Sequence, residues 1–553
     1  MGETPRLKAV HYALLALLAL LLFVPGRDKL PPVDRDESRY MEATAQMLQS
    51  GDFIDVRFQD QPRYLQPAGI YWLESAAVAA VSAPQAREAW AYRVPSLIGA
   101  TLAVLLTAWI GSTLFGRLAG LAAGVLLAGS VLLGVEARMA TIDATLLAVI
   151  LAAQAALLAV FLRRDSADPP GRTPAALYWA ALGVGLMLKG PVILLVSWGT
   201  ILALLVFERR VRWLGRLRPK WGVPLMLAIV LPWCIAIAWI SHGGFFASSV
   251  GHNFLGKVAT GQQAHGMTPG YYLLAFTLAF WPGSLLAVLA PPFVWTERRS
   301  PQVRFLVAWI IPTWVVFELV ATKLPHYVLP TYPAIACLAG AALAARAWRN
   351  GRVWFWVSRV YGGLWALLGL GLALAGPLLL WWFEGRFSLP ALLLGLAVLA
   401  LVAGALWCVL RPLPWFALTA AMAASVLVAV SAYLFVLPAL NTIWLSPRVA
   451  AAVTALRPCP DSVVASSSYH EPSLVFLLGK DTKLVVDADA AADYLAQQKA
   501  CGLALVEARE QPAFLARLAA ANITPRQLAE IKGIDYSDRG KRLALTLWAG
   551  PGG

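Results

Sequence analysis

The chain has 553 residues, of which 59% are hydrophobic and only 14% are charged. Soluble globular proteins carry about 25% charged residues, so this composition excludes a wholly soluble protein and indicates a polytopic membrane protein with a smaller soluble part. The formal net charge is +15. Most of the excess is arginine in short loops between apolar segments, which is typical of membrane proteins and argues against nucleic-acid binding.

Apolar segments long enough to cross a bilayer recur along the chain, about 13 of them. They are predicted at residues 9–25, 94–114, 118–137, 142–162, 174–188, 191–207, 223–241, 271–293, 305–321, 326–345, 354–382, 389–410 and 415–437. The first follows Arg6 and Lys8 as in a signal peptide, but no small-x-small cleavage site precedes Pro25, which favours a retained helix. The sequence therefore predicts a mainly α-helical membrane domain over residues 1–440.

Lysine and arginine gather in alternate loops when the N-terminus is placed in the cytoplasm. The basic residues of these loops are Arg117, Arg163, Arg164, Arg172, Arg209, Arg210, Arg212, Arg216, Arg218, Lys220, Arg298, Arg299, Arg304, Arg346, Arg349, Arg352 and Arg411. By the positive-inside rule these loops are cytoplasmic, and the C-terminal tail lies on the opposite, external side of the membrane.

The tail, residues 441–553, is predicted to form a small external α/β domain. Strand patterns occur at 462–465, 482–486, 503–506 and 543–547, with helical segments rich in Ala, Leu and Gln between them. Cys459 and Cys501 lie in this domain and can pair where the compartment is oxidising. The paired and the free state both stay open at this point.

Two long loops face the external side, at residues 26–93 and 242–270. In the first loop Tyr40, Met41, Thr44, Met47 and Leu48 recur at helical spacing, with polar residues opposite and a glycine stop after them. This pattern predicts an amphipathic helix lying on the membrane surface. A second apolar helix is predicted at about residues 70–81.

The predicted topology brings charged and titratable residues from distant segments to the external face. They are Asp36, Glu37, Glu136, Arg138, Asp143, Lys189, His252, His265, Lys323 and His326. Carboxylates, lysines and histidines at one face predict a site that binds an anion and moves a proton.

Each of these residues also has a purely structural explanation. Asp34-x-x-Glu37 resembles a capping box, and a carboxylate in the first turn of a span, such as Asp143, suits the helix dipole. Lys189 and Lys323 could reach the interface from helix ends, and Arg93 could anchor to lipid headgroups. His265 suits a metal ligand or a phosphate hydrogen-bond donor, but also a surface histidine without a role.

Several short motifs, in order, resemble those of bacterial GT-C glycosyltransferases, the family that includes the aminoarabinose transferases of lipid A and relatives of the protein O-mannosyltransferases. The matching runs are 36–40, 47–52, 71–73, 93–96, Asp143, 189–191, the loop of His265, and 322–327. The likeness covers about the first 440 residues, and the spans followed by an external α/β tail also resemble the aminoarabinose transferase layout.

The resemblance implies a membrane glycosyltransferase of the bacterial inner membrane, with its active site and C-terminus in the periplasm. The donor would be a sugar on polyprenyl phosphate and the acceptor lipid A, lipopolysaccharide or another envelope glycolipid, with no nucleotide cofactor. Asp36 would activate or orient the acceptor hydroxyl, and Asp143 would assist the acceptor or a metal.

The remaining roles implied by the resemblance concern the donor phosphate, its surroundings and a divalent metal. The phosphate ligands would be Lys189, Lys323, His265, Arg93 and Gln66. Secondary residues would be Glu37, Arg39, Tyr40, Glu136, Arg138, His326 and Tyr327, and a divalent metal would use His265, Asp36 and Asp143.

One run departs from the family pattern. The aminoarabinose transferases carry Glu-Lys-Pro in the first loop, whereas this chain has Tyr64-Leu65-Gln66-Pro67. Gln66 can donate a hydrogen bond but supplies no positive charge. A transporter or flippase of a lipid-linked substrate, a protein O-glycosyltransferase and an inactive scaffold are the alternatives. A transporter would place its charges near the bilayer midplane between internal repeats, and the sequence shows neither feature.

Overall fold

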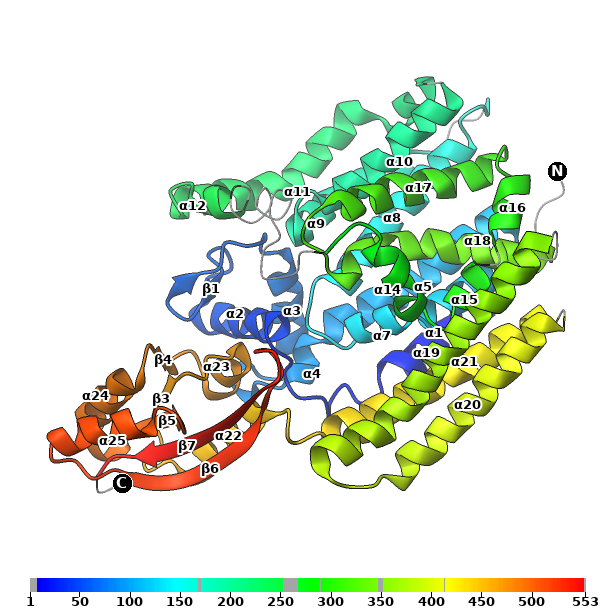
Figure 1. The fold of residues 1–553 in the computed structure, drawn as a ribbon. Helices are drawn as coiled ribbons and strands as arrows, with labels where there is room; N and C mark the ends of the chain where they lie inside the picture. Colours follow the sequence, from blue (N-terminus) through cyan, green and yellow to red (C-terminus); the bar gives the residue numbers. More distant parts are fainter. Residues whose placement is uncertain are drawn as a thin grey trace.

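The computed structural model consists of a helical body and a smaller α/β domain beside it (Figure 1). It describes residues 7–167, 171–209, 211–249, 251, 267–288, 290–346, 352–411 and 413–551. Eight helical stretches within these residues are long and apolar enough to cross a membrane. The chain is a multi-pass membrane protein.

Long helices account for most of the body. They are α1 (Ala9–Phe23), α5 (Val94–Phe115), α6 (Arg117–Ala128), α8 (Asp143–Leu162), α9 (Arg172–Lys189), α10 (Val192–Glu208), α11 (Pro219–Ile240), α17 (Pro301–Leu319), α18 (Tyr332–Ala345), α19 (Arg352–Glu384), α20 (Leu389–Leu410) and α21 (Pro414–Val430). Each coincides with one of the apolar segments predicted from the sequence.

Three predicted spans are divided rather than continuous. The segment 118–137 breaks after α6, where Ser130 accepts a hydrogen bond from the Leu133 N–H and caps the short helix α7 (Val131–Glu136). The segment 271–293 forms α14 (Tyr271–Ala279), α15 (Ser284–Ala287) and α16 (Pro291–Thr296), because prolines lack the N–H that a continuous helix needs. The segment 326–345 starts as a 3₁₀ turn, η4 (Pro325–Thr331), before α18. The count of 13 spans is therefore not confirmed.

Glycine allows the helices at the centre of the body to approach closely. A Cβ atom at Gly120 of α6 would lie 2.5 Å from the Ala108 carbonyl oxygen of α5, and one at Gly340 of α18 would lie 2.4 Å from the Ala119 carbonyl oxygen. Such small-residue contacts replace the hydrophobic driving force that is missing between helices in lipid.

The first of the two predicted external loops carries both predicted helices, α2 (Asp36–Ser50) and α3 (Gly69–Val81). Between and after them lie a short hairpin, β1 (Arg57–Phe58) with β2 (Gln61–Pro62), a 3₁₀ turn η1 (Pro84–Ala86) and the short helix α4 (Ala89–Tyr92). The second predicted external loop falls largely on residues 252–266, which lie outside the described residues.

The polar side of α2 is covered, contrary to the prediction of a helix lying on the membrane surface. Glu42 is fully buried and Gln46 is 7% exposed, because helix α23 (Pro472–Leu478) of the C-terminal domain packs on this side. The guanidinium of Arg87 pairs with Glu42 and also donates to the Phe476 carbonyl of α23. Burial raises the pKa of Glu42 to about 7.

The C-terminal domain is a five-stranded mixed sheet with helices packed on it. Its strand order is β4 (Lys483–Val485), β3 (Val464–Ser467), β5 (Leu503–Glu507), β7 (Lys541–Ala549) and β6 (Arg526–Asp535). β3 runs parallel to β4 and β5, whereas β7 is antiparallel to both of its neighbours. The helices are α22 (Leu445–Leu456), α23, α24 (Ala488–Gln498) and α25 (Gln511–Ala520). Four strands match the predicted ones, and β6 was missed.

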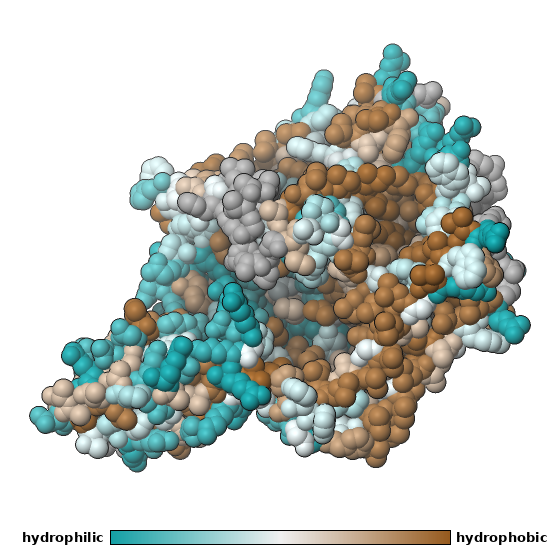
Figure 2. Space-filling model, viewed as in Figure 1, coloured by the Kyte–Doolittle hydropathy of each residue, from teal (hydrophilic) through white to brown (hydrophobic). Residues whose placement is uncertain are grey.

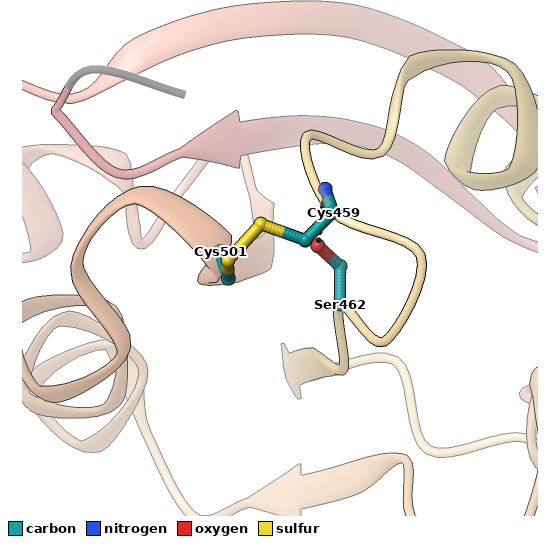
Figure 3. Close-up of a disulfide and its surroundings, with 3 residues drawn as sticks. All are labelled: Cys459, Ser462 and Cys501. Carbon is teal, nitrogen blue, oxygen red and sulfur yellow. Dashed lines mark hydrogen bonds between the residues drawn. A yellow bond between two sulfur atoms is a disulfide. The ribbon is translucent and has the colours of Figure 1, made fainter.

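A disulfide joins Cys459, in the loop after α22, to Cys501, at the end of the turn η8 (Lys499–Cys501) before β5 (Figure 3). Ser462 supports this loop, since its Oγ accepts a hydrogen bond from the Cys459 N–H at 3.1 Å. The bond closes a loop of 42 residues around β3, β4 and α24.

We expect loss of this disulfide to destabilise the C-terminal domain. Closing a loop of 42 residues restricts the unfolded chain, which corresponds to about 4 kcal/mol in the loop-entropy description. The Cys459→Ser/Cys501→Ser variant of the full chain should show faster hydrogen exchange across β3 and β5, with no change in α5 or α8. Unchanged exchange in β3 and β5 would contradict the expectation, and Cys234→Ser is the matched control.

Candidate active site

Four titratable side chains meet where helix ends converge at one face of the body. Lys189, the last residue of α9, places its Nζ 2.6 Å from Oδ1 of Asp143, which begins α8. His326 of η4 lies between two carboxylates, with Nδ1 at 3.5 Å from Glu136 Oε1 and Nε2 at 3.8 Å from Asp143 Oδ2. Glu136 also accepts a hydrogen bond from the Thr141 hydroxyl. This set can hold positive charge and relay a proton between carboxylates.

Asp36 lies apart from these four side chains but faces the same region. Its side chain is 65% exposed and forms an ion pair with Arg39, one helical turn on, at 3.8 Å. Asp36, Asp143 and Lys189 all interact electrostatically with Tyr327, and both aspartates interact with Tyr40. The two predicted catalytic carboxylates, from segments far apart in the sequence, thus lie within electrostatic range of both tyrosines, and the Lys189 ammonium lies 5.8 Å from the centre of the Tyr327 ring. Figure 2 shows the surface hollowed between the helical body and the more hydrophilic part beside it.

Arg63 is a cation of this region that the sequence analysis missed. Its guanidinium lies 5.1 Å from the centre of the Tyr40 ring, and its Nε donates to the Tyr71 hydroxyl at 3.1 Å. The side chain is 8% exposed and interacts electrostatically with Asp36. Tyr40 in turn donates its hydroxyl to Gln66. In the sequence, Arg63 stands directly before the run 64–67 that lacks the family's charges, and this position could have identified it as a candidate.

Arg93, predicted to bind donor phosphate or lipid headgroups, is instead saturated inside the protein. Its guanidinium donates to both carboxylate oxygens of Glu37, at 2.8 and 2.9 Å. It also donates to the carbonyl oxygens of Arg27, Leu30 and Pro31 at 2.7 to 2.9 Å. Both side chains of the pair are fully buried, so the headgroup interpretation is wrong. All five donors of Arg93 are used to fix residues 27–37.

Glu37 and Asp34 do not form the capping box that their spacing suggested. Glu37 accepts hydrogen bonds from the Val33 and Ala140 N–H groups as well as from Arg93. Asp34 points away from the helix to Ser473 of the C-terminal domain, and α2 begins without a side-chain cap.

Two other predicted cations stabilise helix ends. Lys323 is 3% exposed, and its ammonium donates to the carbonyls of Phe317, Glu318 and Val320 at the end of α17. Arg138 donates to the carbonyls of Leu22, Pro25 and Gly134 and lies 3.8 Å from the centre of the Tyr433 ring.

The predicted metal site stays a prediction. His265, and with it His252, lies outside the described residues. Within the described part of the chain, the one close group of His, Cys, Asp and Glu ligand atoms is Cys459, Asp461 and Cys501, and its two sulfurs are bonded to each other.

Comparison with known proteins identifies the fold that holds this site. The family profile "Dolichyl-phosphate-mannose-protein mannosyltransferase" matches residues 31–243, the region of Asp36, Arg63, Arg93, Asp143 and Lys189. The structure of ArnT from Cupriavidus metallidurans bound to undecaprenyl phosphate superimposes with a TM-score of 0.72 over 98% of both chains at 19% identity. Its apo form gives 0.71 over 97% of both chains. The chain has a GT-C fold.

Curated relatives agree with this fold assignment. An undecaprenyl phosphate-alpha-4-amino-4-deoxy-L-arabinose arabinosyl transferase of Pectobacterium atrosepticum is 27% identical over 414 residues, 68% of this chain and 66% of the relative. The enzyme of the same name from Pseudomonas aeruginosa is 27% identical over 344 residues, 59% of this chain and 60% of the relative. The matched region thus spans less than two thirds of either relative. The fold class predicted from the sequence, a mainly α-helical GT-C membrane body with a small C-terminal α/β domain, is confirmed.

We expect Arg93→Met to impair folding rather than donor binding. It leaves the Glu37 carboxylate buried without a counterion and three carbonyls without donors, and breaking such a buried pair costs about 3–5 kcal/mol. Thermal unfolding of the purified protein should show the loss. The Arg93→Met/Glu37→Gln variant should be less unstable than the sum of its single variants. A normally stable Arg93→Met protein with weakened donor binding would instead restore the phosphate-binding interpretation.

Proposed function

We propose that the chain is a glycosyltransferase of the bacterial inner membrane that uses a sugar on polyprenyl phosphate as donor. The acceptor is lipid A or another envelope glycolipid, and the active site faces the periplasm, opposite the arginine-rich loops. The observation that carries the proposal is the Lys189–Asp143 pair at 2.6 Å, 5.8 Å from the Tyr327 ring, with the exposed carboxylate of Asp36 within electrostatic range of the same tyrosine. The likeness to ArnT bound to undecaprenyl phosphate and to aminoarabinose transferases supports the donor class.

In the proposed reaction Asp36 acts on the acceptor. Its carboxylate is exposed, so it can accept the proton of an acceptor hydroxyl as the oxygen attacks the anomeric carbon. The new glycosidic bond forms as the bond from that carbon to the phosphate oxygen breaks. Polyprenyl phosphate leaves with the electron pair, and the anomeric configuration inverts.

Cations near Asp36 neutralise the charge on the departing phosphate. Asp143 holds the Lys189 ammonium at 2.6 Å, which fixes its position before the donor arrives. Arg63, held between Tyr40 and Tyr71, and Arg39, at 3.8 Å from Asp36, are the further phosphate ligands. Positive charge placed in advance where negative charge develops lowers the barrier of such a transfer.

The charges support an enzyme better than a transporter. They lie at the ends of α7, α8 and α9 and on the external loop, whereas transporter sites lie near the bilayer midplane. The match to the protein mannosyltransferase profile makes a protein acceptor the second candidate. A transfer assay with labelled undecaprenyl-phosphate sugars, supplied with lipid A or with periplasmic protein, distinguishes the two acceptors.

We expect Asp36→Asn to lower the transfer rate by about 10²–10⁴, the usual range for loss of a general base. Donor binding should change little, because the amide keeps the size of the side chain and the cations stay in place. Radiolabel transfer in membranes gives the rate, and binding of undecaprenyl phosphate gives the affinity. Asp60→Asn, on the exposed hairpin turn, is the matched control. Equal transfer by wild type and Asp36→Asn would refute the role of Asp36.

We expect Arg63→Gln to weaken donor binding at least tenfold, because a charge-assisted contact to phosphate is worth about 1.5–3 kcal/mol. Arg63→Lys should recover part of the affinity, since it keeps the charge but not the planar fork. The donor KM and the affinity for undecaprenyl phosphate measure the effect. Arg57→Gln, in the same hairpin but half exposed and paired with Asp55, should leave both values unchanged. Normal donor affinity in Arg63→Gln would remove Arg63 from the site.

A further inference from the structure

The C-terminal domain forms hydrogen bonds with the two residues that precede α2, Asp34 and Arg35. The Asp34 carboxylate accepts hydrogen bonds from the Ser473 N–H and hydroxyl, both at 2.7 Å. The Asp34 N–H donates to the Tyr536 hydroxyl at 2.8 Å. Arg35 donates to Glu471 at 3.3 and 3.4 Å and to the Ser537 carbonyl at 2.9 Å. These contacts join Asp34 and Arg35 to the start of α23 and to the turn after β6.

The contact between Ser473 and Asp34 continues into the interior of the C-terminal domain. Ser473 is 1% exposed and Ser446 of α22 is 2% exposed. The Ser473 Oγ lies 2.6 Å from the Ser446 Oγ, which lies 2.8 Å from the Tyr469 hydroxyl. The hydroxyl chain therefore ties Asp34 to α22 and to the loop after β3. Movement of the domain would move the backbone at residue 34 with it.

Asp36 depends on this backbone for its direction. It stands in the first turn of α2, two residues after Asp34, and the helix has no side-chain cap of its own. Its side chain is mostly exposed, with one weak ion pair to Arg39. Exposed side chains with so few contacts take their direction from the backbone that carries them, and misplacement of a reacting group by about 1 Å can cost about 10²-fold in rate.

We propose that the C-terminal domain positions Asp36 for the transfer reaction, with Asp34 and Ser473 as the positioning residues. This inference rests on the proposed function, in which Asp36 handles the acceptor. In this arrangement the C-terminal domain affects the reaction by positioning Asp36, without touching the reacting atoms. It also predicts that weakening the Asp34–Ser473 contact lowers kcat and leaves donor binding intact.

A second contact between the same two parts of the protein supplies a matched control. Gln59, on the β1–β2 turn, donates to the carbonyls of Lys480 and Thr482 at 3.0 and 2.6 Å. It joins the first loop to the C-terminal domain but does not lead to the first turn of α2. A role of the domain in stability alone would make Gln59→Ala and Ser473→Ala behave alike.

The test compares Ser473→Ala, Asp34→Asn, their double variant, Ser473→Thr and Gln59→Ala in the full-length protein. We expect Ser473→Ala and Asp34→Asn to lower kcat at least tenfold per folded molecule, with affinity for undecaprenyl phosphate within twofold of wild type. The kcat of the double variant should be no lower than that of the less active single variant, because both substitutions break the same contact. Ser473→Thr keeps the hydroxyl and the N–H and should recover kcat, and Gln59→Ala should match wild type.

The proposal is overturned if Ser473→Ala and Asp34→Asn keep wild-type kcat, or if Gln59→Ala loses as much kcat as they do. Failure of the proposed function looks different, since wild type itself would then transfer no sugar. Hydrogen exchange of residues 33–41 then decides on the positioning alone. Faster exchange in Ser473→Ala than in Gln59→Ala supports it, and equal exchange overturns it.

Discussion

The fully buried ion pair of Arg93 and Glu37 is the contact on which the segment between α1 and α2, and with it the candidate site, depends. A buried pair is stable only when further hydrogen bonds satisfy both ions. Here every donor of Arg93 has an acceptor, and Glu37 accepts two additional backbone N–H groups. These bonds fix the chain between α1 and α2 against the start of α5 and the segment before α8. The first turn of α2, which carries Asp36, is anchored on one side by this arrangement and on the other by the contacts of Asp34 and Arg35 with the C-terminal domain.

The site itself uses helix ends because charge is costly deeper in the membrane. Asp143 stands at the N-terminus of α8 and Lys189 at the C-terminus of α9, each at the helix end whose dipole favours its charge. Glu136, at the C-terminus of α7, stands at the unfavourable end. Its partners Thr141 and His326 compensate for that placement. The result is a compact group of opposite charges at one face of the body, with a histidine between two carboxylates.

Topology and charge were sufficient to predict that Asp36, Glu136, Asp143, Lys189 and His326 lie on one face. They were not sufficient to tell which cations are available to a substrate. Lys323 and Arg138 bind backbone carbonyls, and hydropathy carries no information about such acceptors. The same limit applies to α2, where periodicity gave the polar side but not the domain that covers it. Strand β6 was missed because its sequence, with Lys and Glu among few apolar residues, has no clear alternation. Its pairing with β7 comes from the tertiary fold.

Arg63 supplies positive charge next to residues 64–67, the run in which the family's charged residues are absent. The absence of the family's Glu-Lys pair there suggested a site short of positive charge, yet the structure holds a buried guanidinium directly before it, between the Tyr40 ring and the Tyr71 hydroxyl. A lysine presents a mobile point charge, whereas a guanidinium presents several donors in a plane and suits a phosphate in a fixed orientation. The two tyrosines hold the guanidinium in place, and the Tyr40 hydroxyl donates to Gln66, so Arg63 and Gln66 both contact Tyr40. We therefore assign to Arg63 part of the positive charge that a donor phosphate needs. In the proposed reaction Arg63 supplies a fixed, planar set of donors for the phosphate, and Tyr40 links it to Gln66 in the run that lacks the family's charges.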